Sequence, residues 1–143
     1  FIALAGEVNR MMPEFTRAKA WRVLNSLGVA PSRARLLVLG VAYKKDLDDC
    51  RESPAIEILE MLVTDGAEVS YHDPYVSELK HTKTEMTSQP LTEEVLKSQD
   101  LVLILTDHSG IDYDFVVRHS GHVLDTRNAT RNVTDHRERI TLL

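Results

Sequence analysis

The segment from Leu36 to Pro74 constrains the fold of this chain more than any other part of it. It begins with an apolar run, Leu36–Val41, and continues through a charged loop into an amphipathic segment that starts at Pro54. A second strand-like run, Glu68–His72, then ends at Asp73-Pro74. A strand, a loop, a helix and a strand in this order predict a βαβ unit, in which the two strands lie parallel.

The rest of the chain continues the alternation of strands and helices. Further strands are predicted at Leu101–Leu105 and His122–Asp125, with a weaker one at Glu85–Ser88. Helices are predicted at Pro54–Asp65, Glu93–Ser98 (capped by Thr92) and Tyr113–Arg118. The strands LLVLGV and LVLIL are continuously apolar, which is typical of a parallel sheet covered by helices on both faces. We therefore expect a Rossmann-like, doubly wound and mainly parallel sheet, followed by a charged, solvated tail over residues 131–139 that the last leucines pin down.

The first thirty residues form a separate unit in the sequence. Apolar residues recur at helical spacing up to Leu27, and Gly28 stands where such a helix would end. Pro13 lies inside this pattern and is expected to kink or divide the helix. We expect its apolar face to pack against another domain or subunit. The chain then divides into a helix with its linker, residues 1–30, and a Rossmann-like domain, residues 31–143.

Composition excludes several classes of protein. The net charge of -5 over 143 residues argues against a nucleic-acid-binding protein. No apolar run reaches the roughly 18 residues of a membrane span, and the first residues do not resemble a signal peptide. Cys50 is the single cysteine, which excludes an internal disulfide framework and fits a cytoplasmic protein, and no histidine spacing predicts a metal site. The chain lacks an initiator Met, so we expect an excerpt of a longer protein.

The loop after the first strand carries the most suggestive cations. Lys44, Lys45 and Arg51 follow that strand, and ligands of open α/β sheets bind beyond the carboxyl ends of the strands. They predict a phosphate or carboxylate ligand; alternatively, the loop is merely solvated and the nearby aspartates pair with these bases. The glycine-rich fingerprint of dinucleotide-binding folds is absent. Ser53 and Pro54 are expected to cap and open the next helix, whose amino end faces the loop.

Two other strand ends carry polar residues. Asp73 either accepts ribose hydroxyls, as an acid in this place does in dinucleotide folds, or forms a turn with Pro74. The run Asp107-His108-Ser109 invites comparison with a catalytic triad, but neighbours in sequence rarely face one another and no nucleophile elbow is present. With Arg127, these strand ends are expected to bring Asp, His and Arg toward one rim.

Four ordered motifs resemble one family. Gly40-Val-Ala-Tyr43-Lys44, Asp49-x-Arg51-x-Ser53-Pro54, Tyr71-His72-Asp73-Pro74 and Asp125-Thr126-Arg127-Asn128 are similar to the C-terminal domain of the UDP-glucose/GDP-mannose dehydrogenases. Val8-Asn9-x-x-Met12-Pro13 resembles the end of that family's central dimerisation helix. The last motif and Thr106-Asp107-His108-Ser109 look most like the branch that acts on UDP-N-acetylhexosamines.

The resemblance implies an NAD-dependent oxidation of the C6 alcohol of a UDP-sugar to a carboxylate. By matching position, Tyr43 and Lys44 would contact the UDP-sugar, Arg127 its nucleotide part, and Arg51 the NAD. The family's catalytic cysteine lies upstream of the central helix, and Cys50 does not take its place. The resemblance thus implies a substrate-binding domain of a homodimeric enzyme, with no catalytic residue of its own and inactive alone.

Two other functions share the expected fold. A receiver-type regulatory module would need acids after the first strand, where this chain has Tyr43-Lys44-Lys45, so its charge has the wrong sign. A small nucleotide- or CoA-binding module of another multidomain protein stays open as the alternative, and it predicts no preference for uridine.

Overall fold

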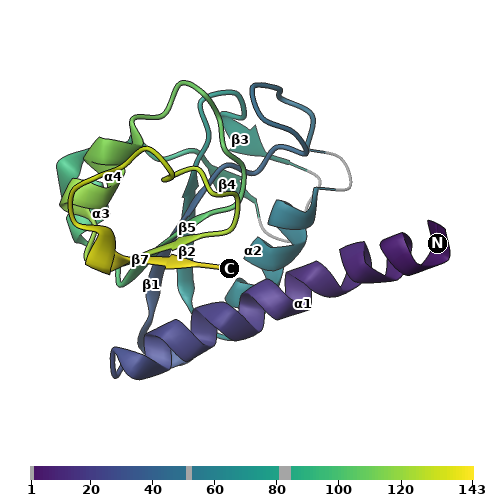
Figure 1. The fold of residues 1–143 in the computed structure, drawn as a ribbon, viewed down its shortest axis with the longest axis horizontal. Coiled ribbons are helices and arrows are strands. Elements are labelled where there is room, and N and C mark those ends of the chain that lie inside the picture. The colour runs from purple at the N-terminus through teal and green to yellow at the C-terminus, as the bar shows by residue number, and fades with distance from the viewer. Residues whose placement is uncertain (1, 51–52, 81–84) are drawn as a thin grey trace.

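A parallel sheet forms the centre of the computed structural model, which describes residues 2–50, 53–80 and 85–143 (Figure 1). In these residues its strands are β1 (Arg35–Leu39), β2 (Glu68–His72), β5 (Leu101–Ile104), β6 (Val123–Asp125) and β7 (Ile140–Leu142). They lie in the order β2-β1-β5-β6-β7, and each pair is parallel. The predicted Rossmann-like, mainly parallel architecture is therefore confirmed.

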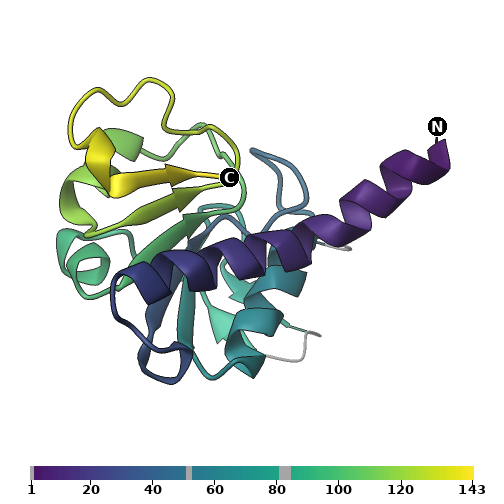
Figure 2. The same cartoon turned by 60° about the horizontal axis from the view of Figure 1, so that its bottom comes forward.

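Helices cover both faces of this sheet. Helix α1 (Ile2–Ser26) and α2 (Pro54–Thr64) lie on one face, and α3 (Glu93–Lys97) and α4 (Tyr113–His119) lie on the other (Figures 1 and 2). In β1, Leu36 and Val38 belong to the core under α1 and α2, whereas Leu37 and Leu39 belong to the core under α3 and α4. Burial on both faces explains why the strands are continuously apolar.

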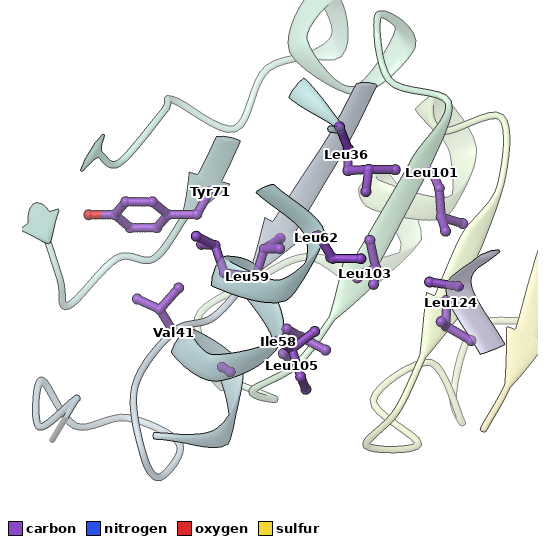
Figure 3. Close-up of a cluster of buried hydrophobic side chains, with 14 of the residues drawn as sticks. Leu36, Val41, Ile58, Leu59, Leu62, Tyr71, Leu101, Leu103, Leu105 and Leu124 are labelled. Carbon is purple, nitrogen blue, oxygen red and sulfur yellow. The ribbon is translucent and has the colours of Figure 1, made fainter. Parts of the chain in front are cut away.

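The core under α2 shows how the first βαβ unit closes. Ile58, Leu59 and Leu62 of α2 project toward leucines of the sheet, including Leu36 and Leu103 (Figure 3). All five side chains are at most 5% exposed. Each such side chain contributes about 2 kcal/mol by leaving water, so this contact holds the crossover helix on the sheet.

Helix α1 narrows two expectations. It runs unbroken from Ile2 to Ser26, so Pro13 does not divide it, although a proline removes one backbone hydrogen bond of the helix. Part of its apolar face packs on its own domain, because Ala20 and Leu24 lie in the core. Arg17 pairs with Asp65 at the end of α2, and the Trp21 indole donates to the same carboxylate at 2.6 Å. The amino-terminal half projects beyond the domain (Figure 2).

Two strands differ from the prediction. The expected strand at Glu85–Ser88 is the two-residue β4 (Met86–Thr87), which pairs antiparallel with β3 (Glu78–Leu79) in a small second sheet. Strand β7 was not predicted; the tail returns to the sheet and pairs with β6 after a 3-10 turn, Arg137–Arg139. The tail over residues 131–139 is largely exposed, as predicted, although Val133 is buried and the Arg137 guanidinium donates to the carbonyls of Thr130 and Val133. A second 3-10 turn, Pro31–Arg33, links α1 to β1.

The helix starts follow the sequence only in part. Thr92 caps α3 as predicted, since its hydroxyl accepts from Val95 N at 3.2 Å. Ser53 stands at the N-cap position of α2 with Pro54 next to it, but its hydroxyl makes no capping hydrogen bond. The first turn uses the Ser53 carbonyl instead, which accepts from Ile56 N at 3.2 Å. No helix in the described ranges is long and apolar enough to cross a membrane.

Candidate functional site

The strand order places a ligand crevice beside β1. The chain leaves β1 toward β2 on one side and later returns to β5 on the other side. Ligands of doubly wound sheets bind beyond the carboxyl ends of the strands at this reversal. The loops that follow β1, β5 and β6 meet there, and they carry the predicted residues Tyr43, Lys44, His108 and Arg127.

The loop after β1 presents its cations on the surface. Tyr43 is 45% exposed, and Lys44 and Lys45 are exposed too. The loop is closed by a hydrogen bond from Tyr43 N to the Asp49 carbonyl at 2.6 Å. Lys44 Nζ lies 6.0 Å from the centroid of the Tyr43 ring. These side chains therefore stand where an anionic ligand at the sheet edge would meet them.

The Asp73 side chain points into the protein. Its carboxylate is fully buried and accepts from Val41 N at 2.8 Å and from His108 Nε2 at 2.9 Å. It also accepts from Tyr75 N at 2.8 Å, which forms the predicted turn. A carboxylate that is buried and saturated in this way does not reach a ribose, so the ribose-acceptor interpretation is wrong and the turn is confirmed.

His108 connects two loops instead of forming a triad. The residue is fully buried, and its Nδ1 accepts from Asp46 N at 2.7 Å. The ring hydrogen therefore sits on Nε2, which donates to Asp73. The Ser109 hydroxyl donates to Asp46 Oδ2 at 2.6 Å and not to the histidine. The expectation that Asp107, His108 and Ser109 form no triad is confirmed.

The carboxylate of Asp46 fixes the same junction. Besides the Ser109 hydroxyl, it accepts from Ser109 N at 2.7 Å. These two hydrogen bonds lower the pKa of Asp46 below its ordinary value, because both favour the charged carboxylate. The sequence analysis predicted that Asp and His residues lie at one edge of the sheet. It did not predict these hydrogen bonds, because His108 lies 62 positions from Asp46 and 35 from Asp73 in the chain.

Arg127 belongs to a loop that its own strand organises. Asp125, at the end of β6, is buried and accepts backbone hydrogens from Arg127, Ala129 and Thr130. The Thr130 hydroxyl donates to the same carboxylate at 2.6 Å. Arg127 is exposed, and its Nε donates to the Leu105 carbonyl at 3.1 Å, which holds the guanidinium at the ends of β5 and β6.

The site therefore presents cations on two loops. Lys44 and Lys45 follow β1, and Arg127 follows β6, with β5 between these strands. The strand axes of β1 and β6 are thus about 10 Å apart, a span that an extended nucleotide crosses. A lysine and a guanidinium suit phosphate oxygens, since both donate charge-assisted hydrogen bonds. Arg51, predicted to reach NAD, lies outside the described residues.

Comparison with known proteins identifies the family. The model of the UDP-glucose/GDP-mannose dehydrogenase family, UDP binding domain, matches residues 37–132, which is more than half of the chain. The chain belongs to this family. The predicted resemblance is confirmed, and the matched range contains the loops after β1, β5 and β6.

Similar proteins come from archaea and bacteria. A UDP-N-acetyl-D-mannosamine dehydrogenase of Pyrococcus horikoshii is 31% identical over 132 residues, which are 89% of this chain and 29% of that protein. The structure of an NDP-N-acetyl-D-galactosaminuronic acid dehydrogenase from Methanosarcina mazei aligns with a TM-score of 0.77 at 26% identity, over 99% of this chain and 30% of that one.

A third family member agrees with these two. The UDP-N-acetyl-mannosamine dehydrogenase of Staphylococcus aureus aligns with a TM-score of 0.73 at 29% identity, over 95% of this chain and 32% of its own. The chain thus spans less than a third of these relatives. These matches favour a domain of this family over the alternative of a nucleotide- or CoA-binding module from another protein.

Proposed function

We propose that this chain is the substrate-binding domain of an NAD-dependent nucleotide-sugar dehydrogenase that oxidises the C6 alcohol of a UDP-sugar to a carboxylate. The observation that carries the proposal is the pair of cationic loops at the strand-order reversal of a domain from this family. Two of the relatives are named as UDP-N-acetylmannosamine dehydrogenases, which supports a UDP-N-acetylhexosamine such as UDP-N-acetylglucosamine or UDP-N-acetylmannosamine as substrate.

Each exposed residue of the site has a role in this proposal. Lys44 pairs with the negatively charged substrate, and Tyr43 packs against it. Arg127 donates to the nucleotide part, since its Nε already fixes the guanidinium against the Leu105 carbonyl. Their support is geometric: all three are exposed on loops of one sheet edge.

NAD, which accepts the hydride, is held mainly by another part of the enzyme in this proposal. Two features of this domain support that division: the chain lacks the glycine-rich fingerprint, and the Asp73 carboxylate is saturated by its own protein. Arg51 is proposed to reach NAD from this side. No catalytic residue is assigned to the chain, and the half-buried Cys50 packs against the core instead.

Three further predictions belong to the whole enzyme. We propose that residues 1–30 are the end of its central dimerisation helix together with a linker, that the enzyme works as a homodimer, and that it is cytoplasmic. Exposed Met12 and Phe15 on α1 support a contact with a second subunit. We also propose that the 143-residue chain produces no NADH alone; NADH formation from a UDP-sugar by the purified chain would contradict this.

Calorimetry tests the binding proposal. UDP and UDP-N-acetylglucosamine are expected to bind the chain, and NAD more weakly. Lys44→Ala should weaken UDP binding, whereas Lys97→Ala on α3 serves as the matched control because its ammonium pairs with Glu93 away from the site. Equal binding of UDP to both variants and to the original chain would refute the assigned site.

A further inference from the structure

We propose that His108 and Ser109 are positioning residues that hold the loop carrying Tyr43 and Lys44 in its ligand-binding shape. They act through Asp46 and through the buried Asp73, without contact to the ligand. This inference rests on the proposed function only for the identity of the ligand. The shape of the loop can be measured without any ligand.

The first anchor of the loop lies where the chain leaves β1. The buried Asp73 carboxylate accepts from Val41 N at 2.8 Å and from Ala42 N at 3.3 Å. The Thr106 hydroxyl donates to the Ala42 carbonyl at 2.9 Å. Residues from the ends of β2 and β5 therefore hold both polar groups of the Ala42 backbone unit.

The second anchor lies four residues further on, at Asp46. Its backbone takes φ = 61°, a left-handed conformation that is uncommon outside glycine. The Asp46 N–H donates to His108 Nδ1, and its carboxylate accepts the N–H and the hydroxyl of Ser109. Since all three partners lie on the loop after β5, they hold the backbone of Asp46 in this conformation.

His108 links the two anchors. Its fully buried ring accepts from Asp46 through Nδ1 and donates to Asp73 through Nε2. The imidazole thus joins the residue that fixes the start of the loop to the residue that fixes its middle. Tyr43, Lys44 and Lys45 are the only residues between these anchors.

Anchoring of this kind affects ligand binding through entropy. A free loop must be ordered when it binds, and an already ordered loop avoids part of that entropic cost. Loosening either anchor should therefore weaken UDP binding while the exposed cations stay present. Because a hydrogen bond contributes on the order of 1 kcal/mol, the loss of one should weaken binding about fivefold.

The first test removes the hydroxyl of the exposed Ser109, which donates to the Asp46 carboxylate. Ser109→Ala should weaken UDP binding about fivefold and speed hydrogen exchange of the Asp46 amide by a similar factor. Core amides such as Leu103 should keep their protection, which separates a loosened loop from a destabilised fold. Ser109→Thr, which keeps the hydroxyl, should restore both values.

Ser98→Ala is the matched control. It also removes one serine hydroxyl. The Ser98 hydroxyl donates to the Val95 carbonyl at 2.8 Å, at the end of α3 and away from the loop. It should change neither UDP binding nor the exchange of the Asp46 amide.

The second test divides the histidine's two contacts. In His108→Gln the amide nitrogen takes the place of Nε2, so donation to Asp73 is retained and the acceptor for Asp46 is lost. In His108→Asn the amide oxygen takes the place of Nδ1, so the opposite contact is retained. The Asp46 amide should therefore exchange faster in the Gln variant, and the Val41 amide faster in the Asn variant.

The outcomes separate this inference from the proposed function. If UDP does not bind the original chain but the Asp46 amide responds to Ser109→Ala, the proposed function fails and the positioning role stands. If UDP binds the original chain and the Ser109→Ala variant equally, with equal exchange at Asp46, the positioning role is overturned.

Discussion

Two loops carry the candidate cations, and they are held in opposite ways. The loop after β6 is organised mainly by one residue of its own strand, Asp125, which accepts hydrogens from three of the next five residues of the chain. The loop after β1 is organised by Asp73 and His108, which lie at the ends of other strands. One loop is thus built locally, and the other depends on the assembled sheet.

The difference determines how each loop is expected to fail. A loop that depends on one carboxylate should be lost when that carboxylate is removed. A loop held by several distant contacts should loosen in steps, unless the backbone at its origin is displaced. The predictions below test this contrast, beginning with the largest effect.

Asp125→Ala should have the largest effect. It removes a buried carboxylate and leaves the amides of Ala129 and Thr130 without their acceptor. Because each unpaired buried donor costs about 1–3 kcal/mol, we expect a loss of about 4 kcal/mol in the free energy of unfolding. Urea denaturation measures it, and Asp112→Ala at the exposed cap of α4 is the control. A loss below that of the control would break the claim that Asp125 is the main anchor of its loop.

Gly40→Ala tests the origin of the other loop. Gly40 has φ = 86°, and an added Cβ would lie 2.5 Å from the Cβ of Thr106. Backbone strain and overpacking together should cost about 3 kcal/mol in the free energy of unfolding. Gly110→Ala is the control, since an added Cβ there meets no atom within 4 Å. Similar stability of both variants would show that the close packing at β1 is unimportant.

The cations themselves should affect binding and not folding. Lys44→Ala and Arg127→Ala each remove a charge-assisted contact with UDP, worth about 2 kcal/mol, so each should weaken binding roughly thirtyfold. Their unfolding free energies should fall by no more than about 1 kcal/mol, because both side chains are exposed and Arg127→Ala removes one hydrogen bond, to the Leu105 carbonyl. An effect from one variant alone would show that the ligand spans only one of the two loops.

Low pH should have the smallest of these effects: protonation of Asp46 should weaken its hydrogen bonds to Ser109 and so loosen the loop after β1. The folded-state pKa of Asp46 is lowered by the two Ser109 hydrogen bonds, so the contact is complete above the ordinary value of 3.8 and is lost as the pH falls through the lowered pKa. NMR titration of the Asp46 carboxyl carbon measures this. In Ser109→Ala the midpoint should rise toward 3.8; an unchanged midpoint would mean that the hydroxyl contributes nothing.

The same contrast explains what the sequence predicted. The continuous apolar runs predicted β1 and β5 correctly, because a strand buried on both faces needs apolar residues at successive positions. Thr92 predicted the start of α3, because a threonine is a common N-cap residue. Tyr43, Lys44 and Arg127 were correctly predicted to lie at one edge of the sheet, because the carboxyl ends of parallel strands share that edge. Strand β7 was missed because its three residues follow a charged tail and are specified by pairing with β6.

Long-range contacts were the part beyond prediction. Nothing near Asp73 or His108 in the sequence indicates that their side chains meet, because the contact exists only when β2 and β5 flank β1. The ribose-acceptor interpretation of Asp73 failed for this reason. The sequence pattern of an aspartate at a strand end is the same whether its carboxylate faces a ligand or the protein interior.

The most direct measurement is an NMR titration of the labelled chain with UDP. Millimolar UDP should shift the amide resonances of residues 43–46 and 126–128 together, and the shifts should follow one binding curve. Resonances of the amino ends of the strands, such as Arg35 and Leu101, should stay unchanged. Shifts confined to another surface, or none in either loop, would contradict the account that these two differently built loops form one nucleotide-sugar site.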